Sequence, residues 1–191
     1  FVLVLLFTGY LVLFRNDYFD RTRSIAMLCT MVVMFPLMVS LMMRFNKFSL
    51  YIIPFAMAAI FIRVFLDSRT AFITHVTMIL VCAVEVRYQY EFVIIQIVGG
   101  LVAIYSLREL SKRSQIYLTA VLVTLASTVV YLAIQLIQSD DPSKLDQSMY
   151  IYFAINGFFL LFTYPLMLVI EKAFGFTSTV TLFELSNTNN Y

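Results

Sequence analysis

Long stretches of apolar side chains, separated by short polar clusters, constrain this chain more than any other feature. Hydrophobic residues make up 62% of the 191 residues and charged residues 13%, about half the charged share of an average soluble domain. A water-soluble fold of this length has too little interior for so many apolar side chains, so they must face lipid. Because the stretches are continuous and do not alternate between apolar and polar residues, they indicate helices and not a β-barrel. The sequence therefore predicts an all-α, polytopic membrane protein.

Seven apolar runs are candidates for membrane-spanning helices. The second, sixth and seventh runs are long and nearly free of charge. The expected architecture is a seven-transmembrane helix bundle, and a re-entrant hairpin in place of the third and fourth runs is the alternative. The runs are Phe1–Phe14, Ser24–Met43, Phe48–Leu66, Thr70–Val86, Phe92–Leu107, Gln115–Ile137 and Met149–Ile170.

The distribution of lysine and arginine predicts the orientation of these runs, since cytoplasmic loops carry an excess of basic residues. With the N-terminal side outside and the C-terminus in the cytoplasm, nine of the 13 basic residues fall on the inside and four on the outside. The formal net charge of only +2 argues against a nucleic-acid partner held through phosphate contacts.

Three ionisable residues near or inside the apolar runs are candidates for a coupling role. Arg63 and Asp67 are four positions apart at the inner end of the third run, so they are expected to share one helix face. His75 lies within the fourth run. Charges at membrane depth are costly and tend to face the bundle interior. The alternatives are an arginine that reaches the headgroups and a histidine that is structural and hydrogen-bonded. The sequence contains no metal-ligand motif and no GxSxG turn.

A second candidate set surrounds the turn between the fourth and fifth runs. Glu85, Arg87 and Glu91 are candidates for the mouth of a ligand pocket, with Gln96 as a further ligand contact, and an ordinary solvated turn is the alternative. Gly99 and Gly100 lie in the middle of the fifth run. Glycines there favour close approach of a neighbouring helix, with a hinge as the alternative.

The C-terminal segment is the third candidate set, and we interpret it as a signal-output junction. A proline in the seventh run predicts a bend before the run ends. Thr181 and Glu184 fit a capping box, which predicts a short new helix leading into a further cytoplasmic domain. The expected organisation is a membrane domain over 1–172 and a juxtamembrane connector over 173–191. The junction residues are Pro165, Glu171, Lys172, Phe174, Gly175, Phe176, Thr181 and Glu184.

Two motifs resemble a known family. The segment Glu171-Lys-x-Phe-Gly-Phe-Thr-Ser-x-Val-Thr-Leu-x-Glu-Leu-Ser-Asn187 resembles the junction that follows the last span in bacterial seven-transmembrane receptors with an intracellular HD hydrolase domain. Those receptors are the PgpH-type cyclic di-AMP phosphodiesterases. The segment Glu91-Phe92, followed by Gly99-Gly100-Leu-Val-Ala-Ile-Tyr-Ser106, resembles the fifth span of the same family.

The resemblance implies a transmembrane sensor and transmitter in the bacterial inner membrane. It also implies an extracytoplasmic domain before Phe1 and an HD phosphodiesterase domain after Tyr191, where two metal ions would activate water. This chain has no His-Asp doublet, so it is expected to hold no cofactor and to be no enzyme by itself. The expected partners are membrane lipid and the protein's own two further domains, with a second copy of the chain as another candidate. The ligand is left open.

Two other functions remain as alternatives to transmission. A small transporter or lipid-handling protein would explain the three prolines within the runs and the glycine pair, because broken helices mark transporter binding sites. A passive membrane anchor for the hydrolase is the other alternative.

Overall fold

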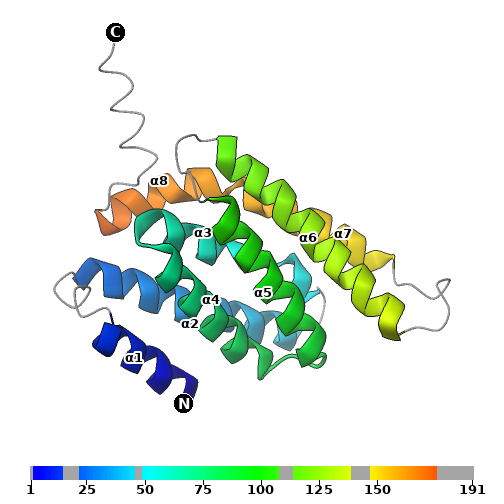
Figure 1. The fold of residues 1–191 in the computed structure, drawn as a ribbon, viewed down its shortest axis with the longest axis horizontal. Helices are drawn as coiled ribbons and strands as arrows, with labels where there is room; N and C mark the ends of the chain where they lie inside the picture. Colours follow the sequence, from blue (N-terminus) through cyan, green and yellow to red (C-terminus); the bar gives the residue numbers. More distant parts are fainter. Residues whose placement is uncertain (1, 15–21, 46–48, 108–113, 139–146, 176–191) are drawn as a thin grey trace, which may run out of the picture.

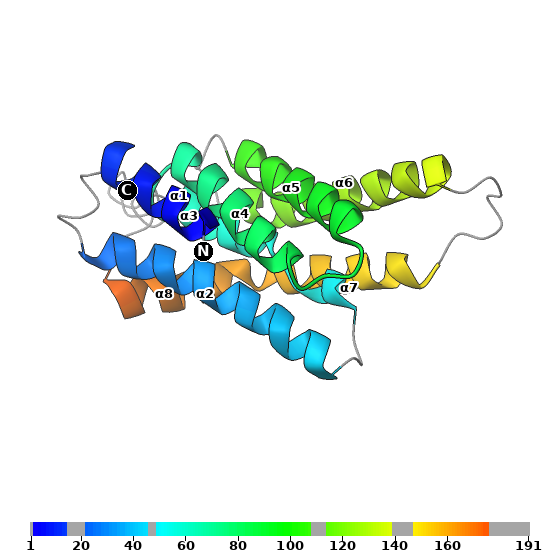
Figure 2. The same cartoon turned by 90° about the horizontal axis from the view of Figure 1, so that it is seen from below.

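A computed structural model of the chain describes residues 2–14, 22–45, 49–107, 114–138 and 147–175. Within these ranges the chain forms helices joined by short turns, so the predicted all-α class is confirmed (Figure 1). Successive helices from α1 to α6 alternate in direction along the body, and α7 and α8 together run back, which brings the end of α8 to the same side as the start of α2 (Figures 1 and 2). The elements are α1 (Val2–Phe14), α2 (Thr22–Phe45), η2 (Leu50–Ile52), α3 (Ala56–Phe65), α4 (Ser68–Ala83), α5 (Gln89–Ser106), α6 (Ser114–Gln138), α7 (Ser148–Leu161) and α8 (Thr163–Phe174).

The described helices fall into two length classes. Three of them, α2, α5 and α6, are long and apolar enough to cross a membrane, and α7 with α8 passes the same test as a bent pair, which fits a broken span or a re-entrant loop. The other apolar helices, α1, α3 and α4, are shorter. A helix rises about 1.5 Å per residue, so the 24 residues of α2 cover the roughly 30 Å of a hydrocarbon core, whereas the ten residues of α3 cover about half. The polytopic membrane class is confirmed.

Apolar side chains project outward from the long helices, as contact with lipid requires. On α6 they recur every three or four residues along the exposed face, with polar groups turned toward α5 and α7. The exposed apolar residues of this face are Leu118, Val121, Leu122, Leu125, Val129, Leu132 and Leu136.

The third apolar run does not form the single helix that the sequence predicts. It forms the short turn η2, leaves helical geometry at Ile53 (φ −68°, ψ 123°), and resumes as α3 only at Ala56. Pro54 explains the break, because a proline has no N–H to donate and disfavours helical geometry in the residue before it.

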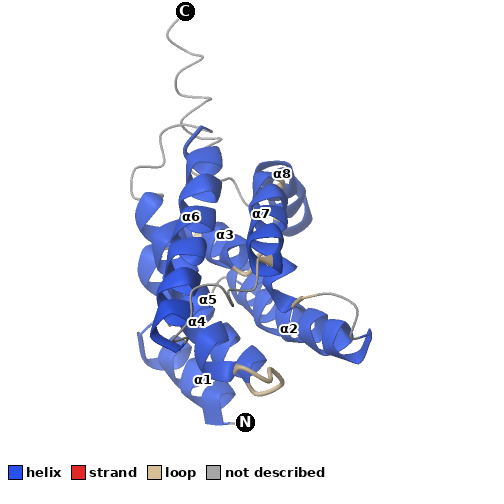
Figure 3. Ribbon diagram, turned by 90° about the vertical axis from the view of Figure 1, so that its right-hand side faces the viewer, coloured by secondary structure: helices blue, strands red, loops and turns tan. Residues whose placement is uncertain are grey.

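The shortness of α3 is compatible with a membrane because protein surrounds it. Eight of its ten residues are buried, and it packs against α4, α5 and α8 near the middle of the body (Figure 3). Irregular backbone at membrane depth is tolerated where protein covers it, and Ile53 and Phe55, on either side of Pro54, are both buried.

The seventh run is bent by 45° where α7 meets α8. Pro165 cannot donate to the carbonyl of Leu161, four residues earlier, and so interrupts the helical ladder at that point. The Thr163 hydroxyl donates to the Leu160 carbonyl at 2.6 Å, and the Phe162 N–H donates to the Phe159 carbonyl at 3.0 Å. These bonds satisfy backbone carbonyls that the break would leave open.

Arg63 and Asp67 do not share a helix face, so that prediction is wrong. The helix that carries Arg63 ends at Phe65, and Leu66 leaves helical geometry with φ −122° and ψ −106°. Asp67 occupies the N-cap position of α4 with an extended backbone, and its carbonyl accepts the N–H of Ala71 at 3.0 Å. Residues four positions apart share a face only when both lie in the same helix. Here a tight turn separates the two residues, and α4 folds back on α3.

Candidate functional site

His75 joins α4 to α5 inside the bundle. Its side chain is buried, and Nε2 lies 2.9 Å from the backbone carbonyl oxygen of Gln96. A carbonyl only accepts, so Nε2 carries the proton and donates. A Cβ atom added at Gly100 would overlap the imidazole ring, so the glycine makes the space that the ring fills. Gln96, expected as a ligand contact, instead binds His75 through its main chain, and its side chain is also buried.

The two adjacent glycines of α5 face two different helices. A Cβ atom added at Gly99 would lie 3.4 Å from the Ser127 hydroxyl oxygen and 3.6 Å from Val123 on α6, which is ordinary contact. Gly100 faces α4, where the His75 ring leaves no room for a Cβ atom. The pair therefore packs α5 against α4 and α6 at the same level.

A cleft of about 540 Å³ opens where α5 begins, α6 ends and α7 begins. Of the three charged residues predicted for a pocket mouth, Arg87 and Glu91 line it, and exposed Glu85 does not. Oε1 of Glu91 accepts a hydrogen bond of 3.3 Å from the Tyr51 hydroxyl. The other lining residues are Tyr51, Tyr88, Gln89, Tyr90, Tyr131, Gln135, Gln138 and Met149. Tyrosine and glutamine side chains thus supply most of the wall of this cleft.

Asn156 of α7 holds Tyr51 in place. Its amide nitrogen donates to two backbone carbonyls of the turn before α3, those of Tyr51 at 2.9 Å and Ile53 at 2.8 Å. The Tyr51 ring packs edge-on against Phe153, with ring centres 5.5 Å apart. Sequence reasoning missed Asn156, although an amide inside an apolar run was a usable signal, because such groups need a partner in the membrane.

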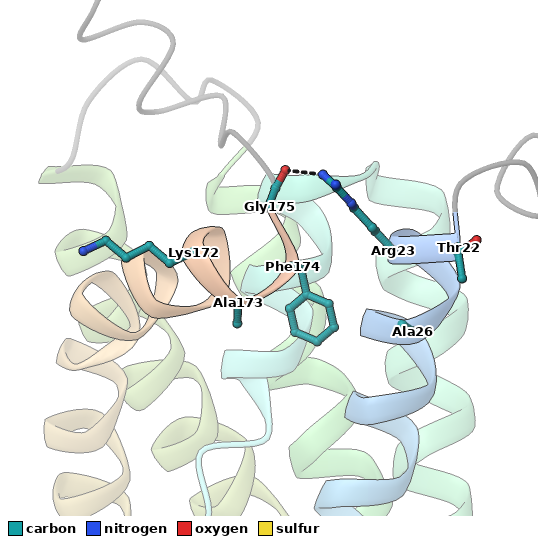
Figure 4. A pocket seen from close by; sticks show the side chains of 7 residues that line it. All are labelled: Thr22, Arg23, Ala26, Lys172, Ala173, Phe174 and Gly175. Atoms are coloured by element: carbon teal, nitrogen blue, oxygen red, sulfur yellow. Dashed lines mark hydrogen bonds between the residues drawn. The ribbon is translucent and has the colours of Figure 1, made fainter.

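The opposite end of the bundle holds the junction. Gly175 ends α8 in the left-handed conformation with φ +64°, and its carbonyl accepts a 3.0 Å hydrogen bond from Nη1 of Arg23 in the first turn of α2 (Figure 4). A Cβ atom added at Gly175 would lie 2.7 Å from that nitrogen. Lys172 points away from Arg23, whereas the Phe174 ring points into the space between α8 and α2 (Figure 4). Sequence reasoning did not single out Arg23, one of the nine basic residues that the predicted orientation places inside.

A pocket of about 380 Å³ surrounds this contact. It lies between the first turn of α2 and the last turn of α8. Glu171 lies in the same last turn of α8, one residue before Lys172. The lining residues are Thr22, Arg23, Ala26, Lys172, Ala173, Phe174 and Gly175.

The remaining predicted residues divide between described and undescribed parts of the chain. Phe176, Thr181 and Glu184 lie outside the described residues, and so does the helix that the capping box predicts. Arg63 is half-buried in α3 and His75 bonds to α5, so these two coupling candidates lie on different helices. Within the described ranges, no three His, Cys, Asp or Glu side chains gather closely enough to hold a metal ion.

Comparison with known proteins identifies the family. A family model described as a 7TM receptor with intracellular HD hydrolase matches residues 1–178, nearly the whole chain. The chain belongs to this receptor family. The match confirms the family that the two motifs resemble; it covers the fifth run and the junction segment as far as residue 178.

One curated relative of this receptor chain is the cyclic-di-AMP phosphodiesterase PgpH of Bacillus subtilis (strain 168). The two are 28% identical over 157 residues, which covers 78% of this chain and 22% of the relative. The chain therefore corresponds to about a fifth of the relative's length. No solved structure matches the chain.

Proposed function

We propose that this chain is the transmembrane sensor and transmitter region of a membrane-bound cyclic di-AMP phosphodiesterase, and that it relays a signal to a cytoplasmic HD hydrolase domain. Membership of the receptor family supports the receptor part of this proposal. The printed activity of the Bacillus subtilis relative supports the substrate. The observation that carries the relay is the hydrogen bond from Arg23 to the last described residue of the junction, Gly175.

This contact couples two helices at the point where the output leaves the bundle. Because Arg23 belongs to α2, a shift of α2 changes the support of the α8 end. The bend between α7 and α8 allows α8 to change its angle while α7 remains packed on α6. A ligand that binds one of two such packings more tightly shifts the population toward it, which is the requirement for coupling.

In the proposed orientation the N-terminal side is outside and the junction is in the cytoplasm of a bacterial cell, with residues 1–172 in the inner membrane and 173–191 as the connector. The excess of basic residues on the junction side supports this orientation. The two metal ions of the reaction would be held by His and Asp side chains of the hydrolase domain and not by this chain. Membrane lipid and the protein's own further domains are the proposed partners.

Replacing Gly175 by valine in the full-length protein tests the relay. A β-branched residue at φ +64° is strained by roughly 1–2 kcal/mol, and its side chain displaces Arg23, so the end of α8 must move. We expect cyclic di-AMP hydrolysis in liposomes to change about threefold or more. Arg23→Gln removes the same hydrogen bond from the other side and should change the rate in the same direction.

Gly9→Val is the matched control, because a Cβ atom added at Gly9 meets no other atom within 4 Å. It should leave the rate unchanged. Exchange of the whole membrane region for an unrelated anchor separates transmission from passive anchoring. If hydrolysis and its regulation survive both that exchange and Gly175→Val, the chain is an anchor and the proposed relay is wrong.

A further inference from the structure

We infer that the outer cleft between η2, α5, α6 and α7 binds a small zwitterion, that is, a molecule carrying one ammonium and one phosphate or carboxylate group. That this ligand is the input signal rests on the transmission function proposed above. That the cleft binds such a ligand rests on the residues of the cleft alone.

Two residues of opposite charge line the cleft. Glu91 and Arg87 line the same space, yet no ion pair joins them in the part of the chain that the structure describes. Two opposite charges that share a cleft without contact leave room for a ligand between them. A ligand with one charge would serve only one of these residues, whereas a zwitterion serves both.

Glu91 provides an acceptor for an ammonium group. Its carboxylate is half-buried, and its Oε1 is engaged by the Tyr51 hydroxyl, whose ring is itself buried. A carboxylate accepts about four hydrogen bonds, so this group retains acceptor capacity for an ammonium. Tyr90, an exposed ring of the cleft lining, adds aromatic surface, and ammonium groups are attracted to the faces of such rings.

Arg87 provides a positive charge at the edge of the cleft. This residue is exposed at the rim, and its guanidinium carbon lies 5.9 Å from the centre of the Tyr88 ring. Contact with an aromatic face restrains the guanidinium, and its planar fork suits a phosphate or carboxylate. The cleft thus offers an acidic site beside buried tyrosines and a basic site at its edge.

The size and walls of the cleft suit such a ligand. Its volume of about 540 Å³ falls within the range of small-molecule sites, roughly 300–1,000 Å³. Its lining comes from η2, the start of α5, the end of α6 and the start of α7. A bound molecule would therefore bridge helices that are distant in sequence, as an input site requires.

The same chemistry occurs in free amino acids and in the ethanolamine headgroup of a membrane lipid. The test uses full-length protein in phosphatidylglycerol nanodiscs and isothermal titration calorimetry with two zwitterionic probes, alanine and glycerophosphoethanolamine. Ethanolamine and dimethyl phosphate are the probes with one charge. We expect one zwitterion to bind about tenfold or more tightly than either singly charged probe. Nanodiscs containing phosphatidylethanolamine should abolish that signal by competition if the source is lipid, and leave it intact if the source is a free solute.

Variants connect binding to the two charges. Glu91→Gln retains an acceptor for Tyr51 but removes the charge, and Arg87→Gln removes the cation; each should weaken zwitterion binding about tenfold or more. Glu85→Gln and Arg44→Gln, exposed residues outside the cleft lining, are the matched controls and should bind as the unmodified protein does.

The inference is overturned if neither zwitterion binds at up to about 10 mM, if a singly charged probe binds equally well, or if the Glu91 and Arg87 variants retain full affinity. These results are separate from the Gly175→Val result. If zwitterions bind as expected but Gly175→Val leaves hydrolysis unchanged, only the relay is refuted. If Gly175→Val changes hydrolysis but no zwitterion binds, only the ligand site is refuted.

Discussion

Replacing Gly100 by alanine is expected to lower the free energy of unfolding of the membrane region by about 2–4 kcal/mol. The added Cβ atom would overlap the imidazole ring of His75, which is fully enclosed and bonded to the Gln96 carbonyl. The ring must therefore give up its hydrogen bond or force α4 away from α5. Both costs exceed the roughly 1 kcal/mol that alanine gains over glycine in a helix interior.

The neighbouring glycine provides a matched control. Gly99→Ala gains the same helix propensity, and its Cβ atom meets only ordinary contacts, so this variant should be neutral or slightly more stable. Stability is measured in full-length protein as the denaturant dependence of Cys82 alkylation, since Cys82 is buried and reacts only when the bundle opens. Cys29, exposed on the apolar helix α2, is the internal reference, and the alkylating reagent is membrane-permeable so that it reaches lipid-facing thiols.

The double variant His75→Ala with Gly100→Ala identifies the cause. Without the ring, the alanine at position 100 meets no clash, so the two substitutions should be less harmful together than their sum by about 1 kcal/mol or more. Strict additivity, or equal effects of alanine at positions 99 and 100, would contradict the proposed packing role of His75.

Asn156→Asp is expected to destabilise the membrane region by about 3 kcal/mol or more. The amide nitrogen donates to the carbonyls of Tyr51 and Ile53, and a carboxylate in its place brings a negative charge against two carbonyl oxygens. Because these bonds hold the turn before α3 against α7, their loss should also loosen Tyr51 and weaken zwitterion binding in the outer cleft.

The same chemical change at an exposed site controls for charge alone. Gln147→Glu, at the start of α7, should change the free energy of unfolding measured by Cys82 alkylation by less than about 0.5 kcal/mol. Asn156→Leu removes the donors without adding a charge. Its loss of stability should lie between the losses caused by Gln147→Glu and Asn156→Asp. A stable Asn156→Asp variant with unmodified Cys82 protection would show that the two carbonyls do not depend on this amide.

The sequence predicted the helices better than their contacts. The runs Ser24–Met43 and Gln115–Ile137 correspond within two residues at each end to α2 and α6, because lipid exposure imposes a long apolar stretch that is visible locally. Proline chemistry explains the unpredicted break at Pro54 and the predicted bend near Pro165, since each proline removes a backbone donor from an otherwise continuous run.

The contacts that build the candidate sites were not predictable in the same way. Arg23 and Gly175 are 152 positions apart, and Asn156 is 105 positions from Tyr51. Local periodicity carries no information about such pairs. Arg87 and Glu91 were found because they flank one short turn, where neighbours in sequence are also neighbours in space.

The bend at Phe162 turns α8 into a lever arm. Its 12 residues measure about 18 Å, so a rotation of about 10° at the break would carry the tip sideways by about 3 Å. A displacement of that size would carry the Gly175 carbonyl out of hydrogen-bonding range of Arg23 unless the arginine side chain changed its conformation. Small rotations at Phe162 would thus become much larger displacements at the Gly175 end of the helix.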